Sequence, residues 1–573
     1  MLVLSASAWR GMGKVLDSLS SSRMGKTKRV GSVLGKVMVY VLIWLGITLL
    51  FAGIGIHIFW GSISVDQMMM NLVAAQADGG GGALVWIGIF GFGVAPVALT
   101  LLIAYLRHRY VRGVHRKHAA KVEAAEASDA TELAEAAQVV ESSTAAESDK
   151  SGEAFQLPKV PRMPKVVPAL TVTALVAGGA MAFGSSVHVT EYIRASNSDY
   201  TMDEYYKAPV VADSSEKRNI VLIYLESGEE TLTDTELFEK DAFEPLKNVT
   251  REEDGWSSVA DLQQYEGGGW TMAGISGTQC GVPLKGNGLL NGKSGFNALG
   301  EVGDYLGGLT CMGDILKDEG YHQVFMGGAM GSFASKDTFL YSHGYDESYG
   351  LEHWREQNEP EDQIRADWGL SDQRLMANAK NKVDELHAQS QETGQPFNLS
   401  MLTVDTHEPV HIHPYCDVDT EEEVTSMFQC SQEQVADFVN YMDSQGYLED
   451  TAVVMMGDHL KHMGASNAFH EQLDDHPNRT IFNRFWIPGN DPRHATMRPG
   501  VDQMSMMPTI LEAAGIRMTN DQAGLGVSAY DSVIPEGSAQ ALSPEAYEDL
   551  MKSRSAEFYE QAWEGQELEK LEK

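Results

Sequence analysis

Basic residues are scarce in this 573-residue sequence, which has 43 Lys and Arg against 80 Asp and Glu and a formal net charge of −37. A protein that binds the phosphate backbone of a nucleic acid needs a basic face, so this balance argues against that class of function. No internal repeat of fixed period is present, which excludes solenoids and propellers. The length instead allows roughly two to four units with room for a soluble core.

Three stretches lack charged residues over a length that can cross a bilayer, which takes about 20 apolar residues. They are Val37 to Trp60, Ala83 to Leu106 and Val166 to Val187. The third is rich in Ala and Gly, and a buried helix is the alternative for it. The N-terminus also lacks the order of charged, apolar and cleavage regions of a signal peptide, so we expect the first stretch to remain as an anchor.

The loop between the first two stretches, Gly61 to Gly82, has no Lys or Arg. Basic residues gather instead before the first stretch, after the second and before the third. By the positive-inside rule these flanks are cytoplasmic, and everything after about His188 lies outside the membrane. The basic flanks contain Arg10, Lys14, Arg23, Lys26, Lys28, Arg29 and Lys36, then Arg107, Arg109, Arg112, Arg116 and Lys117, then Lys159, Arg162 and Lys165.

This topology divides the chain into six segments. Ala, Glu and Ser dominate from about Ala119 to Glu153, which predicts a polar helix or a disordered linker without chemistry of its own. The segments are a cytoplasmic basic N-terminus (1–36), two spans with a short outer loop (37–106), a cytoplasmic acidic linker (107–165), a third span (166–188), an outer domain (189–535) and an acidic, helical C-terminal tail (536–573).

Cysteine is rare as well, and all four cysteines fall in the outer segment without the CxxC spacing of a zinc site. An exported compartment permits disulfides, and four cysteines allow three connectivities. We favour the sequence neighbours, Cys280 with Cys311 and Cys416 with Cys430. Free buried thiols are the alternative.

The outer segment is predicted to be α/β with a largely parallel sheet, because short apolar runs alternate with longer helical stretches from about Arg218. Continuous apolar runs are typical of strands that are buried on both faces. In such sheets ligands bind outside the carboxyl ends of the strands. The predicted strands are Asn219–Leu225, Tyr321–Met326, Phe397–Val404 and Thr451–Met456.

Polar side chains follow three of these strands. Glu226 comes directly after the first strand, Asp458 and His459 follow the last, and His407 lies just beyond the third. A single glutamate in such a place is commonly a helix cap, and a lone histidine is commonly a satisfied polar residue. An adjacent carboxylate and imidazole are both good ligands for a divalent cation, however. Their joint placement at several strand ends favours one site.

A glycine-rich segment before Thr271 supplies a hydroxyl for such a site. The glycines let the backbone approach a ligand, and the apolar residues after Thr271 predict a buried helix that begins at the threonine. A hydroxyl at a helix N-terminus faces the positive end of the dipole, where a phosphate is also attracted. The alternative is that Thr271 is only an N-cap.

At these residues the sequence resembles the phosphoglycerol transferases that modify periplasmic glucans and, more distantly, the lipoteichoic acid synthases. Both belong to the sulfatase-like part of the alkaline phosphatase superfamily, and the resemblance runs from about Tyr205 to Gly526. The matching motifs are Tyr224-Leu-Glu-Ser227, Gly269-Trp-Thr-Met-Ala-Gly-Ile275, Gln279-Cys-Gly-Val-Pro-Leu284, Cys311-Met-Gly-Asp-Ile-Leu316, Lys336-Asp337, Ser342-His-Gly-Tyr-Asp346, Arg365-Ala-Asp-Trp-Gly369, Leu402-Thr-Val-Asp-Thr-His407 and Asp458-His-Leu460.

The resemblance implies a ligand set and a nucleophile. It makes Glu226, Thr271, Asp458 and His459 the ligands of one divalent cation, with Thr271 also the nucleophile. Mn²⁺ suits such a carboxylate-rich site best, and Mg²⁺ or Zn²⁺ is possible.

The resemblance also implies substrate contacts. Lys336 stands where lipoteichoic acid synthases have a phosphate-binding arginine, and a lysine offers a point charge in place of a bidentate fork. His407 stands where they have a substrate-contacting histidine and is a candidate catalytic residue, as is Lys336. Arg365 and Trp368 complete the expected substrate-binding set.

These expectations describe a membrane-anchored phosphoglycerol transferase. It would move glycerol phosphate from phosphatidylglycerol, through a phospho-threonine, to a cell-envelope glycan. The Trp-Asn-Arg motif of the polymerising enzymes is absent, so a long glycerol phosphate chain is not expected. A phosphoethanolamine transferase or a lipid-headgroup phosphodiesterase with the same metal site is the alternative, and a catalytically silent envelope-binding protein is the alternative from another class.

Overall fold

The computed structural model describes residues 34–58, 61, 86–140, 166–195, 197–286, 304–462, 464, 467–489 and 492–563. The chain divides into two compact units, one made of residues 1–54 and 87–183 and the other of residues 55–86 and 184–573.

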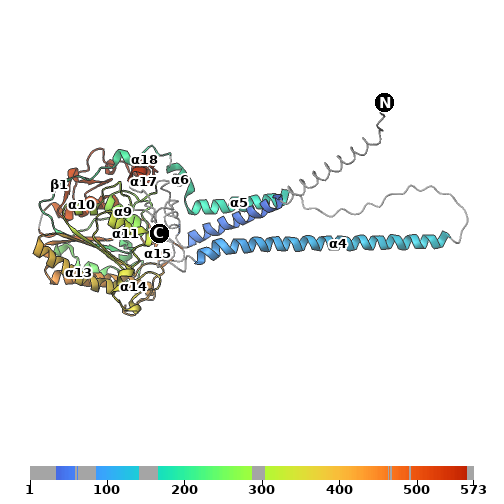
Figure 1. The fold of residues 1–573 in the computed structure, drawn as a ribbon, viewed down its shortest axis with the longest axis horizontal. Coiled ribbons are helices and arrows are strands. Elements are labelled where there is room, and N and C mark those ends of the chain that lie inside the picture. Colours follow the sequence, from blue (N-terminus) through green and yellow to red (C-terminus); the bar gives the residue numbers. More distant parts are fainter. Residues whose placement is uncertain are drawn as a thin grey trace, which may run out of the picture. The chain divides into compact units, whose positions relative to one another are not determined.

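Three helices of the described chain are long and apolar enough to cross a membrane, at Leu34–Ile58, Trp86–Lys117 and Ala169–Ser186. The second continues into α4 (Ala95–Val140), and the third lies in α5 (Val166–Ser186), as Figure 1 shows. Because α4 extends beyond Leu106 to Val140, the first part of the expected linker is helical. The rest of that linker, 141–165, lies outside the described residues.

Glycines bring the first and third of these helices into backbone contact. A Cβ built on Gly179 would lie 2.4 Å from the carbonyl oxygen of Gly46, and one on Gly53 would lie 2.7 Å from the carbonyl carbon of Ala182. Small residues of this kind let two apolar helices approach closely in a membrane.

The second unit is built on a six-stranded sheet with the strand order β4-β3-β5-β2-β6-β7. All neighbouring strands are parallel except β7, which runs antiparallel to β6 at one edge. The sheet confirms the expected α/β class and contains all four predicted strands. Its strands are β2 (Asn219–Leu225), β3 (His322–Gly327), β4 (Glu347–Tyr349), β5 (Phe397–Leu402), β6 (Thr451–Gly457) and β7 (Asn483–Trp486).

Strand β5 ends two residues before the expected Val404. The backbone N–H groups of Val404 and Asp405 donate to the Asp372 carboxylate, at 2.8 and 3.1 Å, instead of to a neighbouring strand. This side chain therefore turns the chain away from the sheet at the point where His407 follows.

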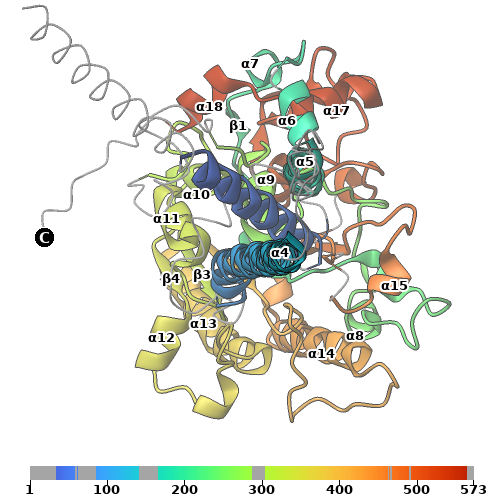
Figure 2. The ribbon, with the colours of Figure 1, turned by 90° about the vertical axis from the view of Figure 1, so that its right-hand side faces the viewer.

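Helices cover both faces of the sheet, as Figure 1 shows. In β2, Ile220, Leu222 and Tyr224 pack into one core and Val221, Ile223 and Leu225 into the other, as the two-residue period of a strand requires. The first core includes side chains of α9 (Thr271–Cys280), α10 (Met312–Asp318) and α16 (Met506–Ala513). The second includes side chains of α8 (Glu244–Val249), α13 (Asp372–Thr393) and α14 (Glu423–Ser444), and α8 lies beside α14 in Figure 2.

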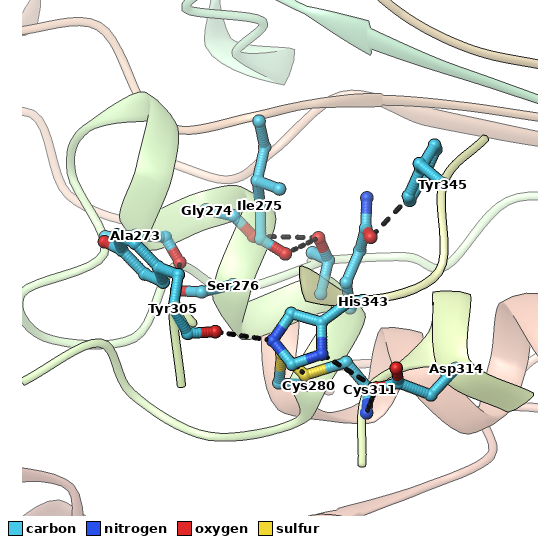
Figure 3. The surroundings of a disulfide bond; sticks show 12 residues. Ala273, Gly274, Ile275, Ser276, Cys280, Tyr305, Cys311, Asp314, His343 and Tyr345 are labelled. Atoms are coloured by element: carbon cyan, nitrogen blue, oxygen red, sulfur yellow. Dashed lines mark hydrogen bonds and ion pairs between the residues drawn. A yellow bond between two sulfur atoms is a disulfide. The ribbon is translucent and has the colours of Figure 1, made fainter. Parts of the chain in front are cut away.

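Both disulfides pair sequence neighbours. Cys280, the last residue of α9, is bonded to Cys311, which caps α10, and Cys416 is bonded to Cys430 in α14. Beside the first disulfide His343 is buried, and its ring nitrogens lie 2.7 Å from Asp314 Oδ2 and 2.8 Å from the Tyr305 carbonyl oxygen (Figure 3). The disulfide therefore joins the start of α10 to the helix that begins at Thr271.

The C-terminal segment is not a separate tail, which corrects the expected boundary at residue 535. It forms α17 (Pro544–Lys552) and α18 (Ala556–Ala562), as helices were expected here, but their apolar side chains enter the domain core. Tyr559 donates its hydroxyl to the Pro283 carbonyl at 2.6 Å, and Trp563 donates its indole N–H to the Lys285 carbonyl at 2.9 Å. The domain thus extends at least to Trp563 because these aromatic side chains are buried within it.

Candidate metal centre

Three expected ligands meet at the carboxyl ends of two neighbouring strands. Glu226 follows β2, and Asp458 and His459 follow β6. One ligand atom from each of the three side chains lies within 4.8 Å of the others, and all three are buried. The parallel register of β2 and β6 produces this convergence, since Leu225 pairs with Gly457 and the next residue of each strand is a ligand.

Two glycines allow the loops after β2 and β6 to touch. A Cβ built on Gly457 would lie 1.9 Å from the carbonyl oxygen of Gly228. Between the loops, Ser227 donates its backbone N–H to Asp458 Oδ1 at 2.9 Å and its hydroxyl to Glu226 Oε1 at 2.8 Å. Its positive φ of 56° directs both groups, although such backbone is unusual for a residue with a side chain. Ser227 was not expected among the site residues, and the matching Tyr-Leu-Glu-Ser motif was the available signal.

The protonation of His459 leaves one ring nitrogen available to a cation. Its Nδ1 lies 2.7 Å from the Leu460 carbonyl oxygen, which can only accept, so Nδ1 carries the proton. Its Nε2 lies 3.5 Å from Asp458 Oδ2 and 3.7 Å from Glu226 Oε1. Asp458 Oδ2 is itself buried and has no hydrogen-bond partner within the described part of the chain. An orphaned carboxylate oxygen beside an imidazole lone pair fits a divalent cation.

The charges around the carboxylates fit a cation as well. Burial raises the pKa of Asp458, and His459 opposes that shift while Glu226 adds to it. Burial also acts to raise the pKa of Glu226, but the neighbouring His407 and His459 outweigh it and hold that pKa below its ordinary value. Two carboxylates buried this close together repel each other when ionised, so a cation bound between them would stabilise both.

Thr271 is the first residue of α9, after an extended Trp270. Its hydroxyl oxygen lies 3.5 Å from Glu226 Oε2, so the threonine borders the three-ligand cluster. The glycine segment makes this approach possible, because a Cβ on Gly268 would lie 2.7 Å from Gln503 Oε1. The geometry therefore places the expected nucleophile beside the expected ligands.

His407 lies in the loop after β5 and is held by the two residues expected as substrate contacts. The Arg365 guanidinium donates to the carbonyl oxygens of Val404, Asp405, His407 and Pro409, at 3.2, 3.3, 3.4 and 2.8 Å. Trp368 donates its indole N–H to the Glu408 carbonyl at 2.9 Å, and its ring centroid lies 3.7 Å from that of His407. In this structure both side chains thus support the His407 loop.

The imidazole of His407 has a defined proton. Its Nδ1 lies 2.8 Å from the Glu408 carbonyl oxygen and therefore donates, which leaves Nε2 as an acceptor when the ring is neutral. Burial lowers the pKa of His407 even though Glu226 acts in the opposite direction. The neutral ring is thus suited to accept a proton.

Lys336 is a buried cation with no hydrogen-bond partner among the described residues. It begins α11 (Lys336–Ser342), is 4% exposed, and its ammonium lies 5.6 Å from the centroid of the Phe325 ring. Ala334 and Ser335 immediately before it have positive φ values of 54° and 58°. Burial lowers the pKa of Lys336, and carboxylates that include Glu226 and Asp458 oppose that shift. This unpaired charge near the cluster suits an anionic group of a ligand.

Residues 291–516 match the model of the sulfatase family. The chain contains a sulfatase-family domain. The matched stretch includes Lys336, His407, Asp458 and His459, whereas Glu226 and Thr271 lie before it in the chain.

The curated relatives that this chain matches are phosphoglycerol transferases. "Phosphoglycerol transferase I" of Escherichia coli (strain K12) is 33% identical over 369 residues, which are 63% of this chain and 45% of the relative. The Shigella flexneri protein of the same name matches with the same values. The chain thus spans less than half the length of these relatives.

Solved structures also resemble the domain. The lipoteichoic acid synthase LtaP of Listeria monocytogenes is 16% identical, with a TM-score of 0.45, and covers 65% of this chain and 98% of its own. The Streptococcus pyogenes phosphoglycerol transferase GacH, in complex with sn-glycerol-1-phosphate, is 14% identical, with a TM-score of 0.38, and covers 63% of this chain and 90% of its own.

Proposed function

We propose that this chain is a membrane-anchored phosphoglycerol transferase that moves glycerol phosphate from phosphatidylglycerol to an envelope glycan. The observation that carries the proposal is the position of Thr271, at the head of α9 and 3.5 Å from Glu226 in the three-ligand cluster. The curated relatives support the headgroup, since they are phosphoglycerol transferases at 33% identity.

Glu226, Thr271, Asp458 and His459 would hold one divalent cation. When bound, it would lower the pKa of the threonine hydroxyl and neutralise charge on the phosphoryl oxygens. Mn²⁺ is proposed because carboxylate oxygens dominate the set, although one imidazole also suits Zn²⁺.

The transfer then has two halves. In the first, the oxygen of Thr271 attacks the phosphorus of phosphatidylglycerol, the bond from phosphorus to the diacylglycerol oxygen breaks, and that oxygen leaves with a proton as diacylglycerol. Glycerol phosphate stays on the threonine. Lys336 would face the anionic phosphoryl oxygens throughout, because its buried ammonium has no hydrogen-bond partner among the described residues and lies over the Phe325 ring.

In the second half a glycan hydroxyl replaces the threonine on phosphorus. The neutral His407 would accept the proton of that hydroxyl at Nε2, because Nδ1 already donates to the Glu408 carbonyl. The threonine oxygen regains a proton as it leaves. Water in place of the glycan would give hydrolysis as a side reaction.

The membrane helices fit a lipid donor. We propose that the chain crosses the membrane three times, with its N-terminus in the cytoplasm and residues 189–573 outside. The basic run from Arg107 to Lys117 ends the second candidate span, and the positive-inside rule assigns it to the cytoplasm. A reporter fused after Lys573 that is active only in the cytoplasm would contradict this topology.

The test of the function uses full-length protein in lipid vesicles with Mn²⁺ and headgroup-labelled donors. With labelled phosphatidylglycerol we expect diacylglycerol release and label on Thr271, and an envelope glycan fraction should then take up the label. Phosphatidylethanolamine should give neither product. Transfer of ethanolamine label instead would establish the phosphoethanolamine transferase, and no turnover of either lipid would favour a silent envelope-binding protein.

A further inference from the structure

Gln503 lies at the centre of a contact that sequence reasoning did not reveal. It begins a short 3₁₀ helix, Gln503–Ser505, and its side chain is completely buried. The preceding residue, Asp502, caps this helix, and its carboxylate accepts the backbone N–H of Met504 at 3.1 Å. The glutamine lies more than 200 residues along the chain from Thr271, so only the fold brings the two regions together.

Both the nitrogen and the oxygen of the Gln503 amide form hydrogen bonds at the candidate site. Its Nε2 donates to the carbonyl oxygen of Asp458 at 2.8 Å, and its Oε1 accepts the backbone N–H of Tyr265 at 3.3 Å. An amide side chain supplies a donor and an acceptor together, which no apolar or charged side chain of similar size does. One residue thus links a proposed cation ligand to the loop that leads to Thr271.

The two glycines beside the Gln503 amide, Gly274 and Gly268, leave no room for a side chain. A Cβ on Gly274 would lie 1.9 Å from the Asp458 carbonyl oxygen and 3.3 Å from Gln503 Nε2. One on Gly268 would lie 2.7 Å from Gln503 Oε1. The amide therefore fills a corner between helix α9, its preceding loop and the Asp458 carbonyl.

A second glutamine joins the same two segments from the same loop. Gln264 Oε1 accepts the backbone N–H of Leu460 at 2.7 Å. The carbonyl of Leu460 in turn fixes the proton on His459 Nδ1. The two glutamines thus hold the segment from Asp458 to Leu460 against the loop before Thr271.

We propose that Gln503 is a positioning residue that sets the separation between the Thr271 hydroxyl and the pair Asp458 and His459, with Gln264 as its partner. The inference rests on the proposed function, because it assigns Thr271 and the pair to one cation. Residues of this kind orient ligands, and their loss typically lowers metal affinity or activity by about 10-fold to 100-fold.

The test compares Gln503→Met with Gln323→Met in metal-stripped full-length protein. Gln323 is also fully buried and donates to two carbonyls, those of Gly313 at 2.7 Å and Gly344 at 3.0 Å, but it lies at the amino end of β3, away from the site. Both variants lose a buried amide, so they share the structural cost of the substitution. The readouts are Mn²⁺ affinity by electron paramagnetic resonance, and kcat and KM for phosphatidylglycerol.

We expect Gln503→Met to weaken Mn²⁺ binding and lower kcat, each by about tenfold or more, with little change in KM, and Gln323→Met to leave both within about twofold. If Gln503→Met binds Mn²⁺ and turns over lipid as the parent does, the proposal is wrong. If Gln503→Met does not fold, Gln264→Met decides by the same criteria. Parent protein that binds Mn²⁺ without turning over lipid would end the proposed function, yet the comparison of Mn²⁺ affinities would still decide this inference.

Discussion

Gly274 lies directly against the carbonyl group of Asp458: a Cβ built on the glycine would stand 1.9 Å from that oxygen. Gly274 is the fourth residue of the helix that Thr271 begins, and Asp458 is a proposed cation ligand. The absence of one side chain thus sets how closely the threonine helix approaches the ligand segment.

Gly274→Ala is expected to abolish most of the activity even though alanine favours helices. Alanine in a helix interior gains about 1 kcal/mol over glycine, but here its Cβ would push α9 away from Asp458. A displacement of about 1 Å at a reacting centre can cost about 100-fold in rate. Lipid turnover measures the loss, and Gly113→Ala in α4, where nothing lies within 4 Å, is the matched helical control. Activity in Gly274→Ala equal to that of the control would show that the helix can move without cost.

The sequence predicted the strand ends well and the contacts between them poorly. Apolar runs identify β2 and β6 because both faces of these strands are buried, and Glu226 and Asp458 follow at once. Nothing local identifies Gln503, whose partners are distant in the chain, or the positive φ of Ser227. Such contacts depend on the tertiary arrangement, which leaves no periodic pattern in the sequence.

The C-terminal segment shows a different kind of error. Its acidic composition predicted a helical tail separate from the domain, but Leu550, Met551 and Tyr559 are buried in the domain core. In α17 the apolar residues Tyr547, Leu550 and Met551 recur at the three- and four-residue spacing of a helix face that packs on a core. This periodicity, and not the net charge of the segment, is the sequence feature that indicates packing on the core.

Ionisation of Asp502 is expected to reduce stability as the pH rises. Burial raises the pKa of its carboxyl from 3.8 to about 6, while Tyr547 donates its hydroxyl to it at 2.6 Å. The folded chain therefore holds this proton more tightly than the unfolded chain, so the contribution to stability is full below about pH 4 and is lost as the pH rises through 6. The loss amounts to about 3 kcal/mol.

Asp502→Asn should remove this pH dependence, since an amide does not titrate. The free energies of unfolding of parent and variant, from denaturant titrations at pH 4 and pH 8, should show the variant gaining on the parent at the higher pH. Exposed Asp254→Asn is the control and should leave the difference between the two pH values unchanged. A constant gap between parent and Asp502→Asn at both pH values would contradict the prediction.

The two disulfides are expected to stabilise the domain unequally. The loops they close span 31 and 14 residues, and the loss of chain entropy predicts about 4 kcal/mol for Cys280–Cys311 and about 3 kcal/mol for Cys416–Cys430. Serine pairs at each position, compared by denaturant unfolding of oxidised protein, measure the two values. Four free thiols in alkylated, unreduced protein would instead show that the pairs do not form.

Thr271→Ala is expected to abolish transfer while the protein keeps its fold and its divalent cation. The hydroxyl is the proposed atom that bonds to phosphorus, whereas Glu226, Asp458 and His459 would still supply two carboxylates and an imidazole to the cation. Thr271→Ser should retain some activity, because the hydroxyl remains and only the methyl group that restricts its rotamer is lost.

Asp458→Ala should lose both the cation and the activity, since a missing carboxylate leaves the cation with too little negative charge around it. Metal content and lipid turnover are therefore measured on the same preparations of these three variants and the parent. Asp458→Ala also separates loss of the nucleophile from loss of the cation, because among these variants only Asp458→Ala should lose the cation as well as the activity. Substantial turnover by Thr271→Ala would mean that Thr271 is an N-cap of α9 and that another group forms the covalent intermediate or none does.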